Sequence, residues 1–102
     1  MSVVVVATIT PVPGEEDAVR EALLSSIPQV HEEPGCELYA LHEGRGEFVM
    51  VERWESPEAL KVHGTAEPLT RLGAALAGKV QGPPVVRRLS AVPAGDPEKG
   101  VV

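Results

Sequence analysis

The segment Val3–Thr10 constrains the fold more than any other part of the chain, because it is rich in β-branched residues and apolar on both faces. Successive side chains of a strand point to opposite faces, which puts Val3, Val5, Ala7 and Ile9 on one side and Val4 and Val6 on the other. The Pro-Val-Pro-Gly sequence at 11–14 ends the strand. The segment therefore predicts a central strand that needs an apolar layer on each side.

The rest of the chain alternates between helical and strand patterns. Apolar spacing predicts a first helix over 15–30, which Pro28 is expected to kink or restart in its last turn. Ser56 as the N-cap and Pro57 as the first helical residue start a second helix, which we expect to break near Gly64–Thr65 and to resume through Leu76. Strands are predicted over 36–43, 47–55 and 85–92, the first two joined by the hairpin sequence Gly44-Arg45-Gly46.

This order of elements, β-α-β-β-α-β, predicts an α+β fold of the ferredoxin-like type, with a four-stranded antiparallel sheet and the helices on one of its faces. The domain would span residues 1–92, followed by a tail over 93–102. Two helices cover one face only, and the strand 47–55 is apolar on both faces as well. Burying the second face is worth roughly 25 cal/mol per Å² of apolar surface, which predicts a homodimer packed sheet against sheet.

Charge and composition exclude several classes of function. The chain has 102 residues and a net charge of −6, and the only adjacent basic pair is Arg87-Arg88, so we expect no nucleic-acid partner. The single cysteine, Cys36, excludes an internal disulfide. The longest apolar run is too short to cross a bilayer and no secretion signal is apparent, so we expect a cytoplasmic protein without membrane contact.

The stretch from Glu52 to His63 contains the best candidates for a site. Strand alternation places Glu52 and Trp54, the only tryptophan, on the same face as Phe48 and Met50. On the following helix, His63 shares a face with Leu60, so the indole and the imidazole can both face the space between sheet and helices. The alternatives are a tryptophan that only fills the core, a histidine hydrogen-bonded at a helix end, and a Glu52 carboxylate paired with Arg87 or Arg88.

Other candidates are weaker. Tyr39 is either a hydroxyl in the pocket or an aromatic at an interface, and Cys36 has the character of a small buried hydrophobic residue. Glu32-Glu33 before Pro34 is typical of a solvated helix end. The three histidines lack metal-ligand spacing, and His31 and His42 are expected to be solvated, so we predict no metal site.

Three pieces of sequence together resemble the antibiotic biosynthesis monooxygenase (ABM) family over about residues 3–92. They are Glu-Pro-Gly-Cys at 33–36, Tyr39, and the pattern E-x-W-x-x-x-E-A-L-x-x-H from Glu52 to His63. The resemblance implies a dimeric α+β barrel, and a pocket lined by Trp54 and His63 with Tyr39 and Glu52 nearby. The family includes cofactor-free monooxygenases of anthrones and quinols, haem-degrading enzymes and sugar-phosphate isomerases.

The chain departs from the family pattern in two ways. It has no asparagine, and Pro68 stands where many relatives carry a second histidine. Our leading hypothesis is a cofactor-independent monooxygenase that oxidises a small quinol or anthrone-like aromatic with O₂. His63 would be the base, Trp54 would stack on the substrate, and Tyr39, Glu52, Phe48, Met50 and Leu60 would complete the pocket. The alternatives are a non-catalytic ligand-binding or accessory domain, and an isomerase of a small carbonyl compound, whose phosphate patch could draw only on Arg87 and Arg88.

Overall fold

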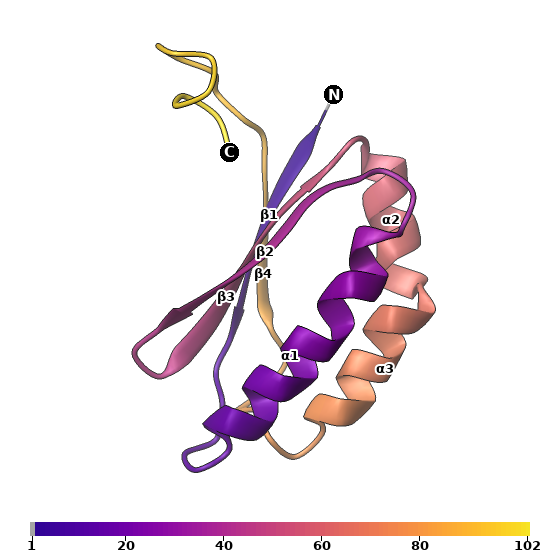
Figure 1. The fold of residues 1–102 in the computed structure, drawn as a ribbon, viewed down its shortest axis with the longest axis vertical. Helices are drawn as coiled ribbons and strands as arrows, with labels where there is room; N and C mark the ends of the chain where they lie inside the picture. The colour runs from indigo at the N-terminus through magenta and orange to yellow at the C-terminus, as the bar shows by residue number, and fades with distance from the viewer. Residues whose placement is uncertain (1) are drawn as a thin grey trace.

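The computed structural model describes residues 2–102. Its elements, in chain order, are β1 (Val3–Ile9), α1 (Glu16–His31), β2 (Cys36–Gly44), β3 (Glu47–Trp54), α2 (Pro57–Thr65), α3 (Glu67–Leu76) and β4 (Val85–Leu89). The strands form one antiparallel sheet in the order β2-β3-β1-β4. All three helices lie on the same side of this sheet (Figure 1). The predicted ferredoxin-like α+β fold is confirmed, with the second helix divided into α2 and α3 as expected.

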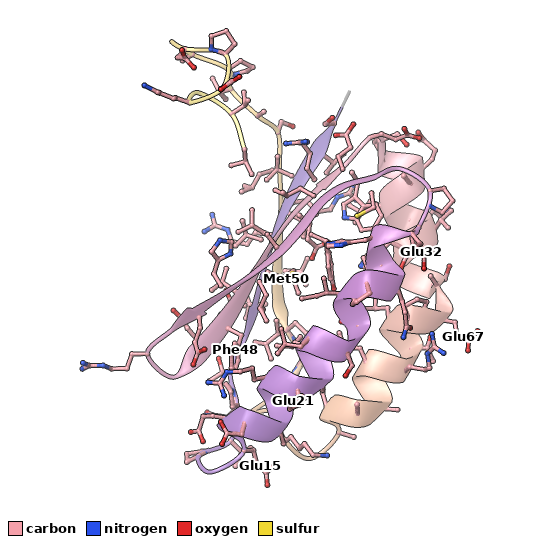
Figure 2. All side chains as sticks on the ribbon, in the orientation of Figure 1. Glu15, Glu21, Glu32, Phe48, Met50 and Glu67 are labelled. Atoms are coloured by element: carbon pink, nitrogen blue, oxygen red, sulfur yellow. The ribbon has the colours of Figure 1, made fainter. Side chains whose placement is uncertain are left out.

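The central position of β1 explains its two apolar faces. Val5, Ala7 and Ile9 lie opposite Glu52, Met50 and Phe48 of β3 and face the helices. Phe48 and Met50, labelled on β3 in Figure 2, are almost fully buried in the core under the helices. On the other face Val6 lies opposite Val51, and both are only half-buried. The sheet therefore has one covered apolar face and one apolar face without a helix.

Three local features differ from the sequence-based expectations or refine them. A β-bulge between Cys36 and Leu38 shifts the register of β2, so Cys36 packs against the core instead of sharing the outer face with Leu38. The last strand ends at Leu89 rather than at 92, because Leu89 already lies opposite Val4, near the start of β1. Helix α1 continues through Pro28 to His31, and Figure 2 marks its two flanking residues, Glu15 and Glu32.

The segment after β4 contains no helix or strand between 93 and 102, and Figure 1 shows it apart from the helices, near the N-terminal end of β1. The Arg53 guanidinium donates a hydrogen bond to the backbone oxygen of Val102 and so links this segment to β3. Within residues 2–102, no helix combines the length and the apolar character needed to cross a membrane.

Candidate functional site

A cavity of about 600 Å³ lies between the sheet and the helices α2 and α3. Its walls are mainly Val, Leu, Ile, Ala, Gly and Pro side chains from β1, α2, α3 and the segment 80–84. Among the described residues that line it, three carry polar side-chain groups: Tyr39, Glu52 and His63. Tyr39 and Glu52 lie directly opposite each other on β2 and β3. The site is therefore an apolar pocket with a small polar cluster.

His63 is placed by helix α2, which starts where the sequence predicts. Ser56 is the N-cap, its hydroxyl oxygen accepting from the backbone N–H of Ala59 at 3.1 Å, and Pro57 is the first helical residue. Two turns later the His63 side chain is buried, and its Nδ1 lies 2.9 Å from Oε1 of Glu33. Because a carboxylate oxygen can only accept, Nδ1 carries the hydrogen and donates. In the neutral ring, Nε2 is then the nitrogen with a free lone pair.

Glu33 is the residue of the site that sequence reasoning missed. It was expected at a solvated helix end, but its side chain is only 9% exposed, and Oε2 is buried without a partner among the described residues. The turn after α1 brings it against α2. Gly35 in this turn has a φ of +81°, and its backbone oxygen accepts from the N–H of Glu55 at 2.9 Å. A Cβ at Gly35 would lie 2.6 Å from that of Ala59, so glycine is what permits the close approach.

Ala59 and His63 lie one helical turn apart on the same face of α2, so the 33–35 turn contacts both. The sequence signal for this arrangement was the Glu-Pro-Gly turn together with a small residue four positions before the histidine. The pairing of Glu33 with His63 spans 30 positions, and spacing rules do not reach that far.

Glu52 is buried and does not pair with an arginine, so that alternative is wrong. Its Oε1 accepts a hydrogen bond from Trp54 Nε1 at 2.9 Å and lies 3.9 Å from Nε2 of His63. Arg88 lies opposite Val5, one strand further from Glu52, and the side chains of β4 are exposed. Burial raises the pKa of Glu52, and this outweighs the hydrogen bond from Trp54 and the nearby imidazole, both of which lower it.

Trp54 is not part of the cavity wall, which corrects its expected stacking on a substrate. It is 0% exposed, and its ring stacks on the His63 imidazole at 4.4 Å between centroids. Phe48 is likewise buried behind the wall, because the inner face of β3 meets the cavity only at Met50 and Glu52. Trp54 thus supports the imidazole from behind and holds the Glu52 carboxyl group.

The remaining predicted residues fall into two groups. Tyr39, Met50 and Leu60 line the cavity as expected, and the Tyr39 ring lies edge-on to His63 at 5.6 Å between centroids. Burial raises the pKa of the Tyr39 hydroxyl, which therefore stays protonated and can donate. His31 and His42 are exposed, as predicted, and no group of three or more His, Cys, Asp or Glu within residues 2–102 is placed to hold a metal ion.

Comparison with known proteins identifies the family. The model of the antibiotic biosynthesis monooxygenase family matches residues 2–72. The chain belongs to this family. Similar solved structures include Rv0793 from Mycobacterium tuberculosis, with 28% identity and a TM-score of 0.85 over 94% of this chain and 100% of that one. A putative antibiotic biosynthesis monooxygenase from Caulobacter crescentus has 32% identity and a TM-score of 0.82, over 89% of this chain and 90% of that one.

PA3566 from Pseudomonas aeruginosa is similar as well, with 28% identity and a TM-score of 0.83, over 89% of this chain and 94% of that one. No protein of curated function matches the chain. The antibiotic biosynthesis monooxygenase match ends at Leu72, inside α3, and so includes the Glu33–His63 pair and both strands that carry Tyr39 and Glu52.

Proposed function

We propose that the chain is a cofactor-independent monooxygenase that oxidises a small aromatic compound, a hydroquinone or an anthrone-like ketone, with O₂. The observation that carries the proposal is the state of His63. Its Nδ1 is held by the Glu33 carboxylate, and its Nε2 faces Glu52 across 3.9 Å in an apolar cavity of about 600 Å³. Apolar cavities of about 300–1,000 Å³ with a few convergent polar groups are typical of small-molecule sites.

His63 would act as the general base. A proton taken by Nε2 converts the ring to an imidazolium, and the adjacent Glu33 carboxylate stabilises that charge at 2.9 Å. The stacked Trp54 ring prevents the imidazole from tilting away from the cavity. The roles of His63 and Glu33 therefore resemble those of the histidine and the carboxylate in other base-catalysed sites.

The reaction balances without an external reductant. An activated CH₂ group of the substrate, which anthrone carries and a hydroquinone has in its keto tautomer, loses a proton to His63, and the carbanion adds O₂ to give a peroxide anion. The imidazolium returns the proton to form a hydroperoxide, which eliminates water and leaves a carbonyl group. One oxygen atom enters the product and the other leaves as water. Tyr39 can donate a hydrogen bond to the oxygen on which negative charge builds up, and so can Glu52 when it is protonated, a form that burial favours by raising its pKa.

Oxygen-uptake measurements with anthrone and 1,4-naphthohydroquinone test this proposal. The substitution His63→Ala is expected to lower the enzymatic rate by about 10²- to 10⁴-fold, the usual contribution of a positioned general base. Glu33→Gln should give a smaller loss, because the amide orients the ring without stabilising its charge. His42→Ala is the control for loss of an imidazole outside the cavity; because His42 lies opposite Val49 on the outer face, the mass of this variant in solution is checked as well.

Two results would contradict the proposal. Equal uptake by the wild type and the His63→Ala variant would remove His63 from the reaction. Tight binding of these aromatics without oxygen consumption would instead favour the non-catalytic ligand-binding alternative. An isomerase of phosphorylated compounds is less well supported, because none of the described residues lining the cavity is a lysine or an arginine.

The homodimer also belongs to this proposal. The outer face of the sheet carries half-buried Val6, Val49 and Val51, and β4 adds Val85 and Leu89, which are 64% and 40% exposed. A second copy packed on this face would bury these apolar side chains, with Arg87 lying among them opposite Val6, and leave the cavity, on the opposite face, free for substrate.

A further inference from the structure

Helices α2 and α3 each present a glycine to the cavity. On α3 the cavity-facing residues are Leu69, Leu72, Gly73 and Leu76, which follow helical spacing and form one apolar stripe with a glycine in it. On α2 the corresponding residues are Leu60, His63 and Gly64. Both glycines are exposed where they border the cavity, whereas the other cavity-facing positions of these two helices carry large side chains, so the two glycines require an explanation.

Neither backbone conformation nor packing requires a glycine at these positions. The glycines with positive φ in this chain do not include Gly64 or Gly73, so a residue with a side chain could adopt the same backbone. A Cβ built at either position meets no atom within 4 Å, so no neighbouring group needs the space. Glycine is also the least favourable helix residue after proline, which makes its presence in the middle of α3 a cost to folding.

What the two glycines provide is width in the cavity. Without a side chain at Gly73, the cavity reaches the backbone of α3 between Leu69 and Leu76, and Gly64 extends the same opening next to His63. We infer that Gly73, with Gly64, determines substrate size: these positions admit an aromatic body of two or three fused rings, which lies flat on the helix backbone while its polar end reaches His63. A single ring does not need this space.

Gly73 carries the inference more strongly than Gly64. Gly64 lies two residues before Ala66, where α2 and α3 separate, so flexibility at that junction could also account for it. Gly73 lies in the interior of α3, remote from the junction, and this second explanation does not apply. The inference rests on the proposed function in one respect only, namely that this cavity is the substrate site.

Ligand binding without oxygen tests the inference separately from the chemistry. We would measure the dissociation constants of phenol, 1-naphthol and anthrone by titration calorimetry under anaerobic conditions. For Gly73→Leu we expect the affinity for anthrone and 1-naphthol to fall at least about tenfold, which corresponds to about 1.4 kcal/mol, while the affinity for phenol stays within about twofold. Ala74→Leu is the matched control, since Ala74 is exposed on the same helix and does not line the cavity.

A second variant keeps the test informative if Gly73→Leu folds poorly. Gly73→Ala should raise the melting temperature by about 4 to 8 °C, because alanine favours the helix and its methyl group meets open space. Four results would each overturn the inference. Two concern the variants' affinities: an equal loss for all three ligands in Gly73→Leu, or the same loss in Ala74→Leu. The other two are no binding of any ligand by the wild type and a lower melting temperature for Gly73→Ala. Size-dependent binding together with absent oxygen uptake would refute the proposed function alone.

Discussion

The contact between the 33–35 turn and helix α2 gives a sharp prediction for the substitution Gly35→Ala. Two separate costs arise at this position. The φ of +81° is a left-handed conformation that costs a residue with a side chain about 1–2 kcal/mol. The new Cβ would also lie 2.6 Å from Cβ of Ala59 and 2.9 Å from Cγ of Glu55, and overpacking of this kind costs about 1–3 kcal/mol. We expect a total loss of about 2–5 kcal/mol in the free energy of unfolding.

The chain offers a matched control for the backbone cost alone. Gly46, in the hairpin between β2 and β3, has a φ of +74°, and a Cβ there meets no atom within 4 Å. Gly46→Ala should therefore lose only about 1–2 kcal/mol. Urea unfolding with linear extrapolation, followed by circular dichroism, gives both values, and the difference between the two variants measures the close approach to α2.

Two further results decide whether the contact acts as described. In a double-mutant cycle, Ala59→Gly should recover part of the loss caused by Gly35→Ala, because it removes the nearest atom. A Gly35→Ala variant no less stable than Gly46→Ala would refute the reasoning, since it would mean that the turn moves off α2 at no cost. Glu33 could not then depend on Gly35 for its position beside His63.

Three other substitutions test separate parts of the structure. Because the pKa of Glu52 is raised above its ordinary 4.5, the unfolded chain loses this proton before the folded chain does as the pH rises. Between the pKa of the unfolded chain and that of the folded chain, the stability of the wild type should therefore fall relative to Glu52→Gln by about 1.4 kcal/mol per pH unit. Urea unfolding at several pH values measures this difference. Trp54→Phe removes the donor to Glu52 and leaves a void, so we expect a loss of about 2–4 kcal/mol, and a loss below about 1 kcal/mol would contradict the buried hydrogen bond. Val51→Glu on the outer face should convert the proposed homodimer to a monomer in analytical ultracentrifugation, and an unchanged mass would argue against this interface.

Strand parity made the inner face of the sheet predictable from the sequence. Alternation placed Phe48, Met50, Glu52 and Trp54 together, and all four are buried under the helices. Parity does not say which part of that face meets a cavity, because this depends on where α1 and α2 cover the strand ends. For this reason Trp54 and Phe48, at the two ends of β3, do not line the cavity, although parity places them on the same face as Met50 and Glu52.

The bulge in β2 and the position of Glu33 lie beyond the reach of local rules. The bulge rotates Cys36 to the inner side, and no residue pattern in 36–38 marks it. Glu32 and Glu33 are equivalent in the sequence as acidic residues at a helix end. They differ only because the turn at Gly35 packs against Ala59 and so points one of them at His63. The distinction is made by a tertiary contact.

The charge state of Glu52 determines what the polar cluster can do. If Glu52 were ionised during the reaction, its carboxylate, 3.9 Å from Nε2, would stabilise the imidazolium but repel the anion formed on the substrate. Burial raises the pKa of this group, so the neutral acid persists to higher pH and can donate a hydrogen bond to that anion instead. Glutamine also donates and cannot ionise. Glu52→Gln should therefore retain most of the oxygen-uptake rate and lose the decline at high pH that Glu52 ionisation causes in the wild type. A rate as low as that of His63→Ala would show instead that Glu52 accepts a proton, and the role of neutral donor would have to be abandoned.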